Sequence, residues 1–203
     1  MYPRKRYGFF CFYDKFVEIK PNKMKDVITL HDKSFVSFIS EQEIEESIDR
    51  VAEQMNMDFA DCTEPPVLLC ILNGSVMFTA ALMKRLNFNC ELMSMKLSSY
   101  AGTSSTGNVR TVMGLTGDVK GKTVIIVEDI VDTGNTIVRL KEILKEAGAK
   151  ESRVCTMLLK PEVYDKDIRL DYVAKEIPNA FIVGYGLDYN ELGRNLKDIY
   201  VIK

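Results

Sequence analysis

The chain alternates between short apolar runs, which are typical of buried strands, and longer stretches in which apolar residues recur at helical spacing. Such spacing follows Ser40 and Glu43, which together match a capping box, so a helix is expected to begin at Ser40. Two further stretches with helical spacing predict helices over residues 76–86 and 137–147.

Other apolar runs have the length of strands, and they lie at residues 67–72, 92–97, 124–127, 154–159, 172–174, 181–185 and 200–202. Because these runs alternate with the expected helices, they predict an α/β fold with a mainly parallel sheet and helices on both faces. Ligands of such sheets bind beyond the carboxyl ends of the strands. Polar residues that directly follow a strand are therefore the first candidates for a functional site.

Length and composition limit the classes of protein to which the chain can belong. With 203 residues and 46% hydrophobic content, it is expected to form one domain over residues 26–203. Residues 1–25 are basic and aromatic but lack the features of a signal peptide, so they are expected to form a poorly ordered N-terminal extension.

The formal net charge of −2 gives no support for nucleic-acid binding, and no apolar run approaches the ~20 residues that span a bilayer. Scattered cysteines without zinc-ligand spacing favour a reducing cytoplasm, and the single histidine, His31, is expected to be a surface or capping residue.

The most informative polar segment directly follows the apolar run 124–127. Glu128 and Asp129 come first, and Asp132 then opens a loop of small residues before the next helical pattern. The loop residues after Asp132 are Thr133, Gly134, Asn135 and Thr136. A small-residue loop before a helix presents several backbone N–H groups to an anion, whereas carboxylates suit hydroxyls or a metal. Together they indicate a ribose phosphate, with the phosphate on the loop and the sugar hydroxyls on Glu128 and Asp129.

The segment over residues 128–136, Glu-Asp-Ile-Val-Asp-Thr-Gly-Asn-Thr, resembles the binding motif for phosphoribosyl diphosphate (PRPP) in type I phosphoribosyltransferases. It has the form found in the 6-oxopurine members, the hypoxanthine-guanine phosphoribosyltransferases. The alternative is an ordinary turn between a strand and a helix, but four further blocks match the family in the same order along residues 28–202. The resemblance implies a mainly parallel twisted sheet flanked by helices, with a small hood formed by the N- and C-terminal segments.

The resemblance also implies an activity in purine salvage. The 5-phosphoribosyl group would pass from PRPP to N9 of hypoxanthine or guanine, which gives IMP or GMP and pyrophosphate. In the family, the residue at the position of Asp132 takes the proton from purine N7 as a general base. The residue at the position of Lys160 donates to the oxygen on purine C6, and an ammonium group, which only donates, would select against adenine. The residues implied to hold Mg²⁺ are Glu128, Asp129 and Asp188.

The other matching blocks concern the phosphates of the substrate. Asn73 and Gly74 stand where the family contacts pyrophosphate through backbone amides, although relatives commonly carry Lys or Arg at the position of Asn73. Arg194 is also implied to contact the pyrophosphate, because its planar guanidinium suits paired oxygens. The loop over residues 133–136 is implied to hold the 5′-phosphate.

Two aromatic or apolar positions are implied to bind the base. Phe181 would stack on the purine, and the backbone of Ile182 would read the purine edge. Ser99 and Tyr100 open a polar segment, and the family uses this segment as a lid that excludes water from the reacting centre.

Some questions stay open from the sequence. Relatives often carry an arginine shortly after the position of Lys160, and none follows closely here. A regulator with the same fold that binds nucleic acid is an alternative, but the acidic chain and the retained Asp132 favour catalysis. A phosphoribosyltransferase for adenine or a pyrimidine is opposed by Lys160 and Phe181. The resemblance implies a homodimer or homotetramer without deciding between them, and it does not rank hypoxanthine, guanine and xanthine as substrates.

Overall fold

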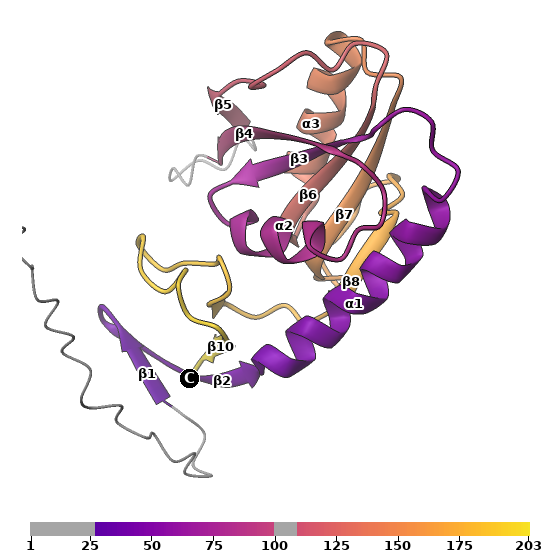
Figure 1. The fold of residues 1–203 in the computed structure, drawn as a ribbon. Coiled ribbons are helices and arrows are strands. Elements are labelled where there is room, and N and C mark those ends of the chain that lie inside the picture. Colours follow the sequence, from indigo (N-terminus) through magenta and orange to yellow (C-terminus); the bar gives the residue numbers. More distant parts are fainter. Residues whose placement is uncertain (1–26, 100–108) are drawn as a thin grey trace, which may run out of the picture.

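The centre of the computed structural model, which describes residues 27–99 and 109–203, is a six-stranded sheet with the strand order β5-β4-β3-β6-β7-β8 (Figure 1). Its strands are β3 (Val67–Leu72), β4 (Glu91–Ser99), β5 (Val109–Met113), β6 (Thr123–Val131), β7 (Glu151–Leu159) and β8 (Tyr172–Glu176). All of them run parallel except β5, which pairs antiparallel with β4 at one edge. The predicted α/β fold with a mainly parallel sheet is therefore confirmed.

Helices cover both faces of this sheet, as the alternation of strands and helices predicts. α1 (Glu41–Asp58) and α2 (Val76–Met83) pack on one face, and α3 (Asn135–Glu146) packs on the other. The capping box of α1 is present, because the Ser40 hydroxyl accepts the backbone N–H of Glu43 while the Glu43 carboxylate accepts the backbone N–H of Ser40. The predicted start of α1 is therefore confirmed.

α2 ends at Met83, which is earlier than the predicted end at residue 86. Asn56 on α1 explains the difference, because its amide donates to Arg85 O at 2.9 Å and accepts from Asn87 N at 2.7 Å. These bonds satisfy backbone groups of the turn that follows the helix. The spacing of apolar residues within α2 cannot reveal such a partner on another helix.

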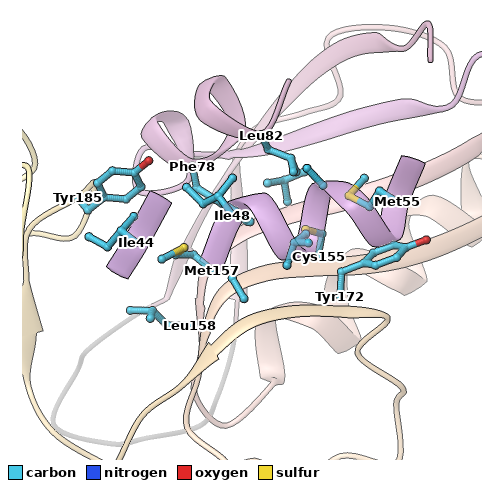
Figure 2. Packing of buried hydrophobic residues seen from close by; sticks show 14 of the residues in the cluster. Ile44, Ile48, Met55, Phe78, Leu82, Cys155, Met157, Leu158, Tyr172 and Tyr185 are labelled. Atoms are coloured by element: carbon cyan, nitrogen blue, oxygen red, sulfur yellow. The ribbon is translucent and has the colours of Figure 1, made fainter. Parts of the chain in front are cut away.

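The larger hydrophobic cluster lies between α1, α2 and the sheet (Figure 2). Ile44, Ile48 and Met55 of α1 meet Phe78 and Leu82 of α2, and all of these side chains are fully buried. Complete burial of a side chain of this size contributes about 1.5–3 kcal/mol, so the cluster fixes both helices on the sheet. A second cluster joins α3 to the opposite face. Among the described residues, no helix is long and apolar enough to span a membrane.

Both ends of the described chain meet in a separate antiparallel sheet with the order β1-β2-β10-β9, which forms the predicted hood (Figure 1). Its strands are β1 (Val27–Leu30), β2 (Lys33–Ile39), β9 (Ile182–Val183) and β10 (Ile199–Ile202). His31 lies in the turn between β1 and β2 and is exposed, as expected. Its Nε2 is 3.1 Å from Asn190 O, so it also joins this turn to the loop between β9 and β10.

Several strands differ from their predictions. β6 continues past residue 127 to Val131, because its pairing with β7 extends beyond Glu128. β9 covers two residues instead of 181–185, because Gly184, Tyr185 and Gly186 have positive φ and cannot continue a strand. β1, β2 and β5 have no counterpart among the predicted strands. The predicted N-terminal extension over residues 1–25 and residues 100–108 of the predicted lid lie outside the described residues.

Candidate active site

A cleft of about 370 Å³ lies where the carboxyl ends of β3 and β6 and the start of α3 face the loop between β9 and β10. The predicted site residues in its lining are Asn73, Gly74, Glu128, Asp129, Asp132, Thr133, Gly134, Asn135, Thr136, Asp188 and Arg194. Lys160, Phe181 and Ile182 lie outside this lining. Tyr100 and the side chain of Ser99 are not among the described parts of the chain. The fold therefore brings most of the predicted residues together at the edge of the sheet where parallel strands bind ligands.

The loop after β6 leads directly into α3. Gly134 is the N-cap with a φ of 81°, a conformation that a residue without Cβ adopts at no steric cost. Among the described residues, no side chain caps this helix start, so its first backbone N–H groups remain available to an anion.

The segment after Lys160 also reaches this loop. The aromatic ring of Tyr164 and the aliphatic part of Lys166 lie so close to Gly134 that a Cβ at that position would overlap the ring. The ammonium group of Lys166 is paired with Asp165. A tyrosine and a paired lysine therefore cover the loop over residues 133–136.

The two carboxylates at the end of β6 are held in a poorly hydrated environment. Glu128 is 5% exposed, and burial together with the neighbouring charge of Asp129 raises its pKa well above the ordinary value. Burial likewise raises the pKa of Asp129 to about 6, although a hydrogen bond from the backbone N–H of Ile130 and the charge of Arg194 act in the opposite direction. Such groups are stabilised by a cation, and hard carboxylate oxygens are the donors that Mg²⁺ prefers.

The predicted Mg²⁺ ligands share the cleft but do not form a closed cage. Asp188 is paired with Arg194 at 2.6 Å and accepts the backbone N–H of Glu191 at 2.8 Å. Within residues 27–99 and 109–203, no three His, Cys, Asp or Glu side chains gather closely enough to hold a metal by themselves. This arrangement fits Mg²⁺, which usually keeps several waters and shares its coordination with substrate phosphates.

The backbone of the turn after β3 lies very close to the acidic residues near the end of β6. The peptide bond between Leu72 and Asn73 is cis. A Cβ at Gly74 would overlap the Asp129 carboxylate, and a Cβ at Gly186 would overlap the carbonyl group of Gly74. Both glycines are therefore required for the close approach of the β3 turn, β6 and the hood loop.

Arg194 joins the hood loop to this cleft. Its Nη1 donates to Gly186 O at 2.8 Å and its Nη2 pairs with Asp188. Its Nε is buried without a hydrogen-bond partner among the described residues. An unsatisfied donor on a cation at a cleft wall suits an anionic ligand, because charge-assisted hydrogen bonds are among the strongest.

Lys160 and Asp132 form a pair beside the cleft. Lys160 is 8% exposed, and its Nζ lies 3.3 Å from Asp132 Oδ2 and 3.4 Å from Asn179 Oδ1. The sequence gives no indication of Asn179 as a partner, because a lysine–asparagine contact across 19 positions has no local pattern. Asn179 lies two residues before Phe181, so the pair is next to the segment that is implied to bind the base.

Phe181 and Ile182 lie at the edge of the hood. Phe181 keeps 43% of its surface exposed, so one part of the ring is open to a ligand. Ile182 lies in β9, the edge strand of the hood sheet, and β9 pairs only with β10 among the described strands. An edge strand has backbone groups that a planar ligand can reach.

Fold and cleft together define the class of phosphoribosyltransferases. The family model described as phosphoribosyl transferase domain matches residues 37–190, so the chain belongs to this family. A curated relative, the hypoxanthine-guanine phosphoribosyltransferase of Streptococcus pneumoniae strain R6, is 40% identical over 90% of this chain and 95% of the relative. A crystal structure of a hypoxanthine phosphoribosyltransferase from Staphylococcus aureus has a TM-score of 0.76 at 38% identity and covers 82% of this chain and 90% of that one. A hypoxanthine-guanine phosphoribosyltransferase structure from Bacillus anthracis also has a TM-score of 0.76, at 36% identity over 82% of this chain and 98% of that one. These relatives place the chain among the hypoxanthine-guanine phosphoribosyltransferases.

Proposed function

We propose that this protein transfers the 5-phosphoribosyl group from PRPP to N9 of hypoxanthine or guanine and releases pyrophosphate with IMP or GMP. The relatives named for this activity, which match nearly the whole chain, support the assignment. The observation that carries it is the single cleft that joins an acidic strand end, an uncapped helix start and an arginine with a free donor. A ribose with phosphates on both C5 and C1 matches these three groups, and a nucleic-acid regulator would not require them.

PRPP would lie along the cleft with its 5′-phosphate at the start of α3. Thr133, Gly134, Asn135 and Thr136 surround the free N–H groups of this helix. The pyrophosphate would then contact the backbone at Asn73 and Gly74 and the guanidinium group of Arg194. Mg²⁺, which we propose as the cofactor, would be held by oxygens of Glu128, Asp129 and Asp188 and would neutralise the phosphate charge.

The base would bind beside Lys160 and Asp132. In the free protein the Lys160 ammonium group faces Asp132, so an incoming purine has a donor for its C6 oxygen and an acceptor for its N7 proton side by side. As purine N9 attacks ribose C1′ and the bond to pyrophosphate breaks, N7 becomes more acidic and Asp132 takes its proton. Phe181 and the backbone of Ile182 would hold the plane and edge of the base.

The activity is tested by incubating the full chain with PRPP, Mg²⁺ and either hypoxanthine or guanine while nucleotide absorbance is followed. Formation of IMP or GMP supports the proposal, and absence of product with both bases refutes it. Competition among hypoxanthine, guanine and xanthine in the same assay would establish their order of preference.

The proposal also covers the domain organisation, the oligomeric state and the cellular location of the enzyme. We propose one catalytic domain over residues 26–203, a lid that includes Ser99 and Tyr100, and a homodimer or homotetramer in the cytoplasm. Light scattering after size-exclusion chromatography measures the number of subunits, and a monomer at micromolar concentration would refute the oligomer.

A further inference from the structure

Two other aromatic rings of the hood pack against the ring of Phe181. The ring of Tyr189 meets Phe181 edge to face, with centroids 5.7 Å apart and an interplanar angle of 86°. Phe35 of β2 is fully buried and lies 6.0 Å from Phe181 and 6.3 Å from Tyr189. These spacings are those of favourable aromatic pairs, so the orientation of the exposed Phe181 ring depends on both neighbours.

Tyr189 in turn is held by the turn between β1 and β2. Its hydroxyl donates to Asp32 Oδ1 at 2.7 Å, and the Lys33 ammonium group lies 5.4 Å from the centre of its ring. The ring of His31 meets Tyr189 edge to face at 5.6 Å, and its Nε2 contacts the carbonyl oxygen of Asn190. Two residues of the β1–β2 turn and the first residue of β2 thus hold one tyrosine that lies more than 150 positions away in the sequence.

We propose that Tyr189 is a positioning residue for the purine: through its bond to Asp32 and its edge contact with Phe181, it holds the Phe181 ring in the plane that stacks on the base. This inference rests on the proposed function, because it assigns a role within the same base site. Tyr189 itself does not line the cleft that holds the phosphates.

The position of Tyr189 separates its effect from the binding of PRPP. Asp188, the preceding residue, is held by other contacts, namely Arg194 at 2.6 Å and the backbone N–H of Glu191 at 2.8 Å. Neither contact involves the ring or the hydroxyl of Tyr189. Loss of the Tyr189 side chain should therefore affect the purine and leave the phosphate side of the cleft in place.

The test is a set of steady-state measurements on the full chain, with KM for hypoxanthine, KM for PRPP and kcat determined for each variant. Tyr189→Leu should raise the KM for hypoxanthine about tenfold, because it removes the ring that supports Phe181. It should leave the KM for PRPP and kcat within about twofold, as expected when binding is lost equally in the ground and transition states. Tyr189→Phe, which keeps the ring but removes the hydroxyl, should raise the KM for hypoxanthine only about threefold.

A double-mutant cycle tests the link to Asp32. Tyr189→Phe and Asp32→Ala should each raise the KM for hypoxanthine about threefold, and the double variant should show no further increase, because both remove one hydrogen bond. Tyr172→Phe is a matched control, since Tyr172 also donates to an aspartate at 2.7 Å but lies in the core away from the hood. Its KM for hypoxanthine should not change.

The outcomes distinguish this inference from the proposed function. If the wild type makes IMP but Tyr189→Leu and Asp32→Ala keep its KM for hypoxanthine, the positioning role is wrong and the function stands. A variant in which both KM values rise and kcat falls by a similar factor would also overturn it, because such a result indicates general damage to the hood. A wild type without turnover overturns both.

Discussion

Replacing Asp129 by asparagine should make the ligand-free protein more stable at neutral pH and less able to bind its substrate. The carboxylate lies at the end of β6, where the missing Cβ of Gly74 allows the backbone to approach it closely. Its Oδ1 accepts the backbone N–H of Ile130 at 2.8 Å, and an asparagine oxygen can accept the same bond. The substitution therefore removes the charge and retains the shape and the hydrogen bond.

The expected gain follows from the raised pKa. Burial raises the pKa of Asp129 from 3.8 to about 6, and each pKa unit corresponds to about 1.4 kcal/mol. Ionisation in the folded state thus costs about 3 kcal/mol at most, and we expect about 2 kcal/mol because the residue keeps some contact with water. The sign is that of a carboxyl group with a raised pKa: the loss of stability begins above pH 4, grows through pH 6 and is complete above about pH 7. For a chain of this size, Asp129→Asn should raise Tm by about 4–8 °C at pH 7.5 and only slightly at pH 4.

Differential scanning calorimetry at both pH values measures this effect. Glu53→Gln is the control, because Glu53 is exposed on α1 and its loss should change stability by less than about 0.5 kcal/mol. Addition of Mg²⁺ and PRPP should reverse the order, since the wild type would gain stability from binding and the variant would gain much less. A Tm shift of the same size at pH 4 and pH 7.5, or a lower Tm of the variant at pH 7.5, would contradict the reasoning.

Further substitutions address the base site and the packing of the hood. Asp132→Asn should keep PRPP binding in calorimetry with Mg²⁺ but lose about 10²–10⁴-fold in kcat, because an amide cannot take the N7 proton; normal turnover would remove Asp132 from the role of base. Lys160→Gln should raise the KM for hypoxanthine and weaken discrimination against adenine, because an amide can also accept from an amino group. An unchanged ratio of kcat/KM for the two bases would refute the role of Lys160 in recognising the oxygen on purine C6. Gly186→Ala should lower Tm by several degrees and weaken PRPP binding, because its Cβ would overlap the Gly74 carbonyl group at a φ of 100°. Gly114→Ala is the control, since a Cβ there meets nothing within 4 Å, and an equal Tm for the two variants would contradict the steric argument.

The features that the sequence predicts well are those with a local physical cause. β3 matches its predicted range, because an unbroken apolar run of strand length between a proline pair and a polar turn favours a short buried strand. The start of α1 follows from a capping box within four residues. The anion site expected at the small residues before α3 stays a prediction, and its donors would belong to the backbone of one continuous segment.

The features that the sequence misses depend on partners far along the chain. β1 has alternating exposed and half-buried residues over four positions, and it becomes a strand because β2 pairs with it on one side and with β10 on the other. The early end of α2 depends on Asn56, and the environment of Lys160 depends on Asn179. β6 continues through Glu128 because β7 supplies backbone partners there, although a carboxylate at that point suggests the end of a buried strand. In each case tertiary contacts override the local pattern.

The free protein leaves polar groups of opposite character incompletely satisfied on two sides of one cleft. Burial opposes the ionisation of Glu128 and Asp129 on β6, while Arg194 has a buried donor without a partner among the described residues and α3 begins there without a side-chain cap. An anion alone would satisfy the arginine and the helix start but repel the carboxylates, and a metal ion alone would have the opposite effect. A complex of Mg²⁺ with PRPP carries both kinds of charge. If the proposed cofactor is correct, these incompletely satisfied groups would therefore favour a substrate that binds as a metal complex over one that binds as a bare phosphate.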